Sequence, residues 1–217
     1  MPQKIFPIGV QDFKGMIEDG FCYVDKTAIV YKLVKSGRNA FLSRPRRFGK
    51  SLLCTTLKYY LLGERELFRG LAIEQLEKDW VSRPVLHMCL SSGDFMSVEG
   101  LMHTLSGNLT DWEAIYGKGE DEQTLARRFA GVMRRAHEQS GQRVAVLVDE
   151  YDKPLLEAMD NPPLQEEFRK ILKSFYGTMK GSDGDIQFIF LTGVTKFSKV
   201  SVFSDLNNIQ DISRNDE

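Results

Sequence analysis

Two short segments, far apart in the chain, carry side chains able to bind a polyphosphate and a metal ion. The first is 41–51, in which Gly49, Lys50 and Ser51 follow an apolar stretch. Backbone N–H groups at a helix N-terminus, with the helix dipole behind them, form an anion site. We therefore expect Gly49 to allow close backbone approach, Lys50 to place its ammonium between the β- and γ-phosphates, and Ser51 to ligate Mg²⁺.

The Gly-Lys-Ser end of this segment matches the Walker A pattern, but its beginning does not. The pattern has a glycine where this chain has Arg44, and the following Pro45 fixes φ and removes an N–H donor. Guanidinium groups in the loop can compensate in part, because they bind phosphate oxygens through two bonds. The alternative is that this segment is an ordinary basic turn before a helix. The apolar stretch directly before it favours the phosphate loop over this alternative. The predicted nucleotide contacts in the loop are Arg46, Arg47, Phe48, Gly49, Lys50, Ser51 and Leu52.

The second segment is an apolar run that ends in two carboxylates. Five consecutive apolar residues precede Asp149 and Glu150, which suits a strand covered on both faces in a parallel sheet. Asp149 is then expected to hold Mg²⁺ through water, and Glu150 to orient and deprotonate an attacking water. The alternative is a buried strand that stops at a solvated acidic turn, and the presence of Lys50 favours the metal site.

A third apolar run, 186–192, ends in a hydroxyl group. In P-loop ATPases with a catalytic glutamate, the strand between the phosphate-loop strand and the Asp-Glu strand ends in a polar residue that senses the γ-phosphate. Thr192 is our candidate for this residue, and Thr195 is the second. A strand end without ligand contact stays open as the alternative, since threonine is itself a good strand former.

Together these segments resemble the AAA-ATPase-like family of bacterial proteins, and the resemblance covers nearly the whole chain. It implies a P-loop NTPase fold, a three-layer α/β/α arrangement with a mainly parallel sheet in the order 5-1-4-3-2, related to archaeal and STAND-type ATPases. It also makes Arg44 part of that family's own loop. The segments that carry the resemblance are Ser43–Ser51, Asp149–Pro154, Leu191–Lys199, Pro7–Phe13 and Tyr23–Thr27.

The family usually adds a helical lid and a C-terminal domain like PD-(D/E)xK nucleases. Those parts need roughly a hundred or more further residues, so we expect 1–217 to be the ATPase core alone, as an excised or truncated product. Nucleic acid would then be reached only through the missing domain. Within this chain Asp12-Phe13-Lys14 fits a nuclease triplet, but it lacks a strand-borne acidic partner.

Composition argues against several other classes of protein. A net charge of −1 does not suit a surface built for nucleic acid, and we assign the basic stretch 38–50 to nucleotide phosphates. The chain has neither an apolar run of membrane-spanning length nor a signal pattern, so we expect a cytoplasmic protein without a membrane partner. The three cysteines and three histidines show no metal-ligand spacing.

Helices and strands are predicted to alternate around these motifs, as a parallel sheet with right-handed crossovers requires. Upstream of the phosphate loop, Tyr23 is expected to line an adenine pocket, with packing against the core as the alternative. Beside the Asp-Glu strand, the predicted strands are 40–43, 84–90, 186–192 and 208–213, and the predicted helices are 25–37, 50–62, 97–115, 121–139 and 165–179.

The sequence therefore predicts a Mg²⁺-dependent ATPase, with ATP as the default nucleotide because no guanine-reading signature is present. The catalytic residues are predicted to be Glu150, Lys50 and Thr192, and the metal ligands Ser51 and Asp149. Turnover is expected to be slow, because no arginine finger in cis is evident. The alternative is a nucleotide-binding switch or scaffold that hydrolyses little ATP, and a homo-oligomer or a protein partner stays open.

Overall fold

A computed structural model describes residues 5–37, 39–195 and 209–213 of the chain. Its centre is a five-stranded sheet in the order β2-β3-β4-β1-β5, in which every strand pair is parallel. Read from the other edge, this is the order 5-1-4-3-2, so the expected α/β fold and strand order are confirmed. The strands are β1 (Asn39–Ser43), β2 (Val85–Cys89), β3 (Val144–Asp149), β4 (Ile186–Gly193) and β5 (Ile209–Asp211).

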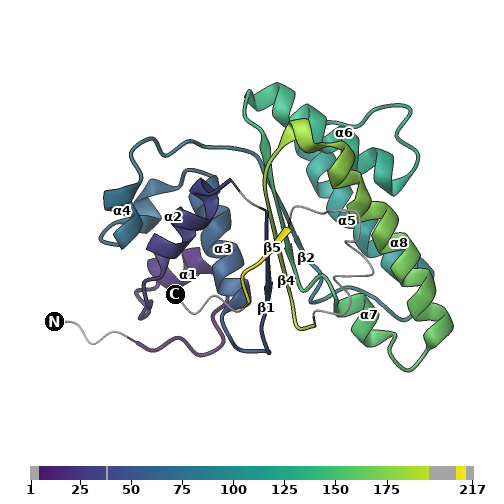
Figure 1. Ribbon diagram of the computed structural model, residues 1–217, viewed down its shortest axis with the longest axis horizontal. Helices are drawn as coiled ribbons and strands as arrows, with labels where there is room; N and C mark the ends of the chain where they lie inside the picture. The colour runs from purple at the N-terminus through teal and green to yellow at the C-terminus, as the bar shows by residue number, and fades with distance from the viewer. Residues whose placement is uncertain (1–4, 38, 196–208, 214–217) are drawn as a thin grey trace.

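Helices cover both faces of this sheet and make a three-layer molecule (Figure 1). One face carries α1 (Phe13–Glu18), α2 (Thr27–Lys35), α3 (Lys50–Leu61) and α4 (Ala72–Leu76), with the short 3₁₀ turn η1 (Arg65–Phe68). The other face carries α5 (Val98–Tyr116), α6 (Leu125–Ser140) and α8 (Pro162–Gly181), and η2 (Asp183–Asp185) leads into β4. The short helix α7 (Lys153–Glu157) lies at the lower edge of the sheet.

The two-residue period of the strands decides which side chains face which helical layer. All of β3 is buried, but its side chains divide between two apolar cores. Those at 144, 146 and 148 pack with α5, α6 and α8, whereas those at 145 and 147 pack with α3. The same division holds in β4, where Phe188 and Phe190 face α3. The next positions in these two series are Asp149 and Thr192, which therefore end their strands on the side of α3.

Local signals explain most helix boundaries. Ser97 caps α5 by accepting the Gly100 N–H, and Asn161 caps α8 by accepting the Leu164 N–H. The prediction that a helix begins at 121 was wrong. Thr124 accepts the Arg127 N–H and starts α6 at Leu125, while the Glu122 carboxylate holds the preceding turn through the Gly119 N–H.

Other differences from the predicted elements are small. Helix α8 is longer than 165–179, because Pro162 and Pro163 suit the first turn of a helix. Strand β5 is shorter than 208–213, and Asn208 lies outside the described residues. The short helices α1, α4 and α7 were not predicted. Within the described ranges, none of the helices combines the length and apolar character needed to cross a bilayer.

Candidate nucleotide-binding site

The loop between β1 and α3 leaves the N-terminus of α3 open to an anion. Gly49 is the N-cap residue with φ of +72°, and no side chain among the described residues caps the helix. Residues 44–49 are exposed. The first N–H groups of a helix have no partner within the helix, and here no side-chain cap occupies them among the described residues.

Arg44 occupies the position of the usual first glycine without needing a left-handed backbone. Its N–H donates to the Gly193 carbonyl oxygen at 3.2 Å, which extends the pairing of β1 with β4 by one residue. The left-handed positions of the loop are instead Arg47, with φ of +70°, and Gly49. A left-handed residue other than glycine costs about 1–2 kcal/mol, and in this loop that strain falls on Arg47.

Lys50 folds back over its own loop. Its Nζ donates hydrogen bonds to the carbonyl oxygens of Arg44 at 2.9 Å and Pro45 at 3.0 Å, and the residue is only 6% exposed. The ammonium therefore sits inside the curve of the loop, bonded to neutral acceptors. Ser51, the next residue, is partly buried in the first turn of α3.

At the end of β3, the structure brings Asp149 and Thr192 together. The Thr192 hydroxyl donates a hydrogen bond to Asp149 Oδ1, and both residues are buried, with exposures of 0% and 3% for Thr192 and Asp149. The same hydroxyl oxygen accepts the Glu150 N–H at 3.3 Å, and the Thr192 carbonyl oxygen accepts the Tyr151 N–H at 3.0 Å. Glu150 has φ of +56°, so the chain turns sharply there and the Glu150 side chain remains partly exposed.

The Asp149 carboxylate affects two neighbouring titratable groups, one of them on α3. Cys54, one turn after Lys50, is fully buried. Burial raises the pKa of the Cys54 thiol well above its usual value, and the negative charge of Asp149 raises it further. His87 on β2 has a lowered pKa, mainly because of burial and Lys58, while Asp149 opposes that shift.

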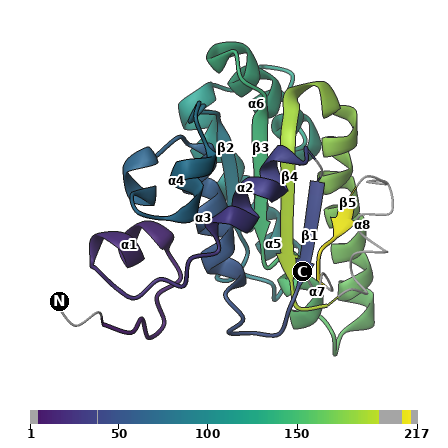
Figure 2. The ribbon, with the colours of Figure 1, turned by 60° about the vertical axis from the view of Figure 1, so that its left-hand side comes forward.

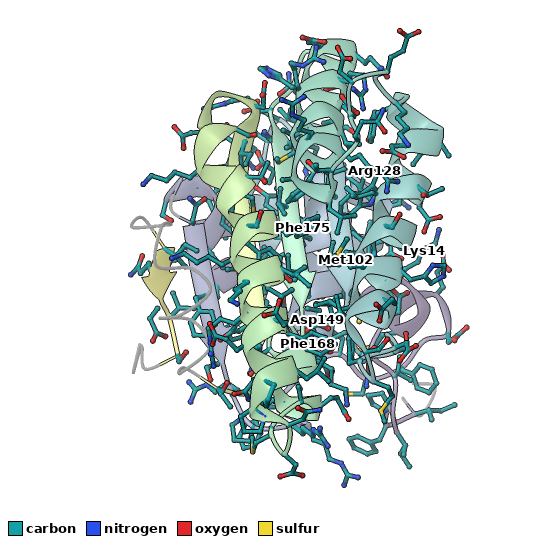
Figure 3. The ribbon with its side chains drawn as sticks, turned by 90° about the vertical axis from the view of Figure 1, so that its right-hand side faces the viewer. Lys14, Met102, Arg128, Asp149, Phe168 and Phe175 are labelled. Atoms are coloured by element: carbon teal, nitrogen blue, oxygen red, sulfur yellow. The ribbon has the colours of Figure 1, made fainter. Side chains whose placement is uncertain are left out.

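The strand ends that carry these groups lie side by side. Ser43 at the end of β1 pairs with Gly193 at the end of β4, and β4 pairs in turn with β3. Figure 2 shows the loop after β1 and helix α7 at the same lower edge of the sheet. In Figure 3, Asp149 lies at the level of Phe168, near the beginning of α8 and therefore at that edge. Lys50, Ser51, Asp149 and Thr192 thus belong to one region, the carboxyl edge of the sheet on the side of α3, and Glu150 follows Asp149 at the same edge.

Two oxygen-bearing side chains of this region are of the kind that Mg²⁺ prefers. Mg²⁺ is usually bound by one or two carboxylates together with substrate phosphates and water, and Asp149 and Ser51 offer a carboxylate and a hydroxyl. Nowhere in 5–37, 39–195 and 209–213 do three His, Cys, Asp or Glu side chains gather as a metal cage.

Two other sequence candidates have different surroundings. Tyr23 is partly buried, and its ring packs edge-on against Phe13 with centroids 5.1 Å apart. The pKa of Tyr23 is raised, because burial raises it by more than a hydrogen bond with Thr56 lowers it. These contacts belong to the core beside α3, and an adenine contact for Tyr23 stays a prediction. The second sensor candidate, Thr195, donates its hydroxyl hydrogen bond to Asp152 Oδ2 at 2.9 Å.

The remaining loop candidates differ in exposure. Arg46, Arg47 and Phe48 are exposed, whereas Leu52 packs partly against the core beneath α3. Sequence reasoning missed a role for Asp152, which is 1% exposed. An aspartate before Lys153-Pro154 is typical of a solvated helix cap, so no sequence signal marks it as buried.

Fold and site define this protein as an α/β protein of the P-loop type. The sequence profile described as "Predicted AAA-ATPase" matches residues 7–203, and the chain belongs to this AAA-ATPase-like family. The chain is 43% identical over 215 residues to an "Uncharacterized protein in vnfD 5'region" of Azotobacter chroococcum mcd 1. The match covers 98% of this chain and 42% of that protein, so the chain spans less than half of the relative's length. No solved structure matches the chain significantly.

Proposed function

We propose that this protein binds Mg²⁺–ATP at the carboxyl edge of its sheet and hydrolyses it. One observation carries the proposal. The uncapped N-terminus of α3, with Lys50 folded into the loop before it, stands on the same side of the sheet as the buried Asp149–Thr192 pair. An open helix N-terminus attracts the phosphates, and a nearby carboxylate suits their metal ion.

Lys50 is the proposed phosphate ligand. In the nucleotide-free loop its ammonium bonds to two neutral carbonyl oxygens. Phosphate oxygens carry a full negative charge, which attracts an ammonium more strongly than the partial charge of a carbonyl oxygen does. ATP would therefore draw the ammonium from the Arg44 and Pro45 carbonyls to the β- and γ-phosphates.

Ser51 and Asp149 would hold Mg²⁺. Such an ion would supply positive charge to offset the negative charge of the phosphates. The Thr192 hydroxyl fixes the orientation of the Asp149 carboxylate through the bond to Oδ1. This leaves Thr192 a positioning role in the absence of nucleotide, in addition to the proposed sensing of the γ-phosphate.

Glu150 is the proposed general base. Its N–H is fixed on the Thr192 hydroxyl, its backbone is left-handed with φ of +56°, and its side chain is partly exposed. A carboxylate placed there can hold a water molecule in line with the γ-phosphate and take its proton.

The experiment is steady-state phosphate release by the wild type and Glu150→Gln. A general base contributes about 10²–10⁴-fold to rate, so we expect Glu150→Gln to lower kcat by at least about 100-fold while ATP still binds. Glu138→Gln on α6 is the matched control, because Glu138 is an exposed carboxylate paired only with Arg134 among the contacts of the described residues. Equal rates for wild type and Glu150→Gln would reject the proposed base.

A second candidate is a nucleotide-dependent switch with little hydrolysis. The observation that favours it is the pair of Lys50 hydrogen bonds to the Arg44 and Pro45 carbonyl oxygens, which ATP would have to replace. Stabilisation by ATP follows RT ln(1 + [L]/Kd). A rise in Tm with ATP and Mg²⁺, without phosphate release, would therefore select the switch.

A further inference from the structure

The two residues that follow the proposed base, Tyr151 and Asp152, hold the end of β4 in place. Asp152 Oδ2 accepts three hydrogen bonds, from the Val194 N–H at 2.9 Å, the Thr195 N–H at 2.7 Å and the Thr195 hydroxyl at 2.9 Å. The Tyr151 hydroxyl donates to the Thr195 carbonyl oxygen at 2.8 Å. Four bonds thus fasten a stretch of two residues that directly follows β4. We call the side chains of Tyr151 and Asp152 the β4 clamp.

The clamp is built into the interior. Tyr151 is 0% exposed and Asp152 is 1% exposed, and the Tyr151 ring meets Phe41 of β1 edge-on, with centroids 5.6 Å apart. Asp152 is at the N-cap position of α7, but its side chain makes no cap bond. The carboxylate is thus committed to the backbone after β4, although an aspartate at a helix start usually bonds to its own helix.

Gly193 lets the clamp approach closely. A Cβ atom at this position would lie 2.5 Å from Tyr151 Cε1 and 2.8 Å from Asp152 Oδ1. Both clamp side chains therefore rest directly on the backbone next to Thr192. Asp152 Oδ1 has no hydrogen-bond partner within the described part of the chain, which fits its packing against this glycine.

The stretch held by the clamp also touches the phosphate loop. The Ser43 hydroxyl donates to the Val194 carbonyl oxygen at 2.9 Å, and the Arg44 N–H donates to the Gly193 carbonyl oxygen at 3.2 Å. Residues 193–195 therefore connect the start of the phosphate loop, the end of β4 and the turn that carries Glu150.

We propose that the β4 clamp is a positioning device for hydrolysis, which sets Thr192 against Asp149 and thereby orients the metal ligand and the Glu150 backbone. The inference rests on the proposed function, because the step it aligns is the attack of water on the γ-phosphate. The clamp does not touch the substrate. It acts through Thr192, whose hydroxyl contacts both Asp149 and the Glu150 N–H.

A comparison of Asp152→Ala with Asp152→Asn separates a positioning role of the clamp from a role in stability alone. Alanine removes the acceptor of all three hydrogen bonds. Asparagine can place its amide oxygen where Oδ2 is and its nitrogen where Oδ1 is, and so keep the three bonds in weaker form. Misplacement of reacting groups by about 1 Å can cost on the order of 100-fold. We therefore expect Asp152→Ala to lower kcat roughly 10- to 100-fold with little change in the Kd of ATP, and Asp152→Asn to recover most of it.

Tyr151→Phe covers the case in which Asp152→Ala does not fold. It keeps the buried ring and removes the bond to the Thr195 carbonyl oxygen, so it should lower kcat less than Asp152→Ala and leave nucleotide affinity unchanged. Hydrogen exchange reports the same structure without turnover. The amides of 194 and 195 should exchange faster in Asp152→Ala than in the wild type, and the amides of β2 should not change.

The control is Asp160→Ala, an exposed carboxylate at the turn between α7 and α8, which should match the wild type in every measurement. A wild type that hydrolyses ATP, together with unchanged kcat in Asp152→Ala or Tyr151→Phe, would overturn the clamp alone. Unchanged exchange at 194 and 195 would overturn it too. A wild type without phosphate release would reject the proposed function and, with it, the role of the clamp.

Discussion

The Thr192 hydroxyl, on β4, donates a hydrogen bond to the Asp149 carboxylate at the end of the neighbouring strand β3. The pairing of Val148 with Leu191 places the two residues next to each other in the sheet. In both strands the side chains at alternate positions before these residues pack against α3. Thr192 and Asp149 continue this alternation, so both lie on the side of the helix that carries Lys50. This bond joins the proposed γ-phosphate sensor to the proposed metal ligand without a bound nucleotide.

Replacing Thr192 with valine tests this link. Valine keeps the shape but removes the donor to Asp149 and the acceptor of the Glu150 N–H. A buried polar group left without a partner costs about 1–3 kcal/mol, so we expect a lower Tm together with a lower kcat. Thr192→Ser keeps the hydroxyl and should restore kcat. A Thr192→Val protein with wild-type kcat would remove Thr192 from the site.

Arg47→Gly should separate the backbone of the phosphate loop from its charge. Glycine adopts the φ of +70° found at Arg47 without strain, which offsets the greater freedom that it gives the unfolded chain. We expect Tm to stay equal or rise, while the KM for ATP rises because a guanidinium is lost from the phosphate loop. Thermal unfolding and steady-state kinetics measure the two effects. A lower Tm with unchanged KM would show that Arg47 serves packing instead.

Glu77 should make stability depend on pH in the acid range. Its side chain is 5% exposed. Burial by itself would raise the pKa of Glu77, but hydrogen bonds from Tyr60, Lys35 and the Asp79 N–H outweigh burial and lower it to about 2. A lowered folded-state pKa stabilises the protein above the unfolded-state value of 4.5, and this stabilisation is lost as the pH falls from there to about 2.

The contribution of Glu77 is at most about 3 kcal/mol, from the linkage of pKa and folding. Urea unfolding at a series of pH values measures it. Wild type should lose more stability than Glu77→Gln between pH 4.5 and pH 2, because glutamine does not titrate. Parallel pH profiles for the two proteins would contradict this assignment.

Much of the site follows from local patterns in the sequence. Five apolar residues before Asp149 predict a strand buried on both faces that ends in the carboxylate, and the structure has this strand. The position of β4 between β1 and β3 agrees with the resemblance that made Thr192 a candidate. These predictions needed no knowledge of contacts between distant residues, other than the order of the strands.

Other features depend on contacts that no local pattern contains. Arg44 tolerates the glycine position because its N–H bonds to the Gly193 carbonyl oxygen, far along the chain. Asp152 is buried because the backbone after β4 supplies three donors to it. Helices of five residues such as α4 and α7 have too few turns to show a helical period.

A pair of glycine substitutions tests the close packing beneath Thr192. In Gly193→Ala the new Cβ meets the Tyr151 ring and Asp152 Oδ1 at 2.5 and 2.8 Å, and overpacking of this kind costs about 1–3 kcal/mol. In Gly177→Ala, on α8, the new Cβ meets nothing within 4 Å, and alanine favours a helix interior over glycine by about 0.5–1 kcal/mol. We therefore expect Tm and kcat to fall in Gly193→Ala, while Tm rises and kcat stays unchanged in Gly177→Ala. Equal effects of the two substitutions on kcat would mean that the backbone beneath Thr192 has room to move, and that the contact of Thr192 with Asp149 does not depend on it.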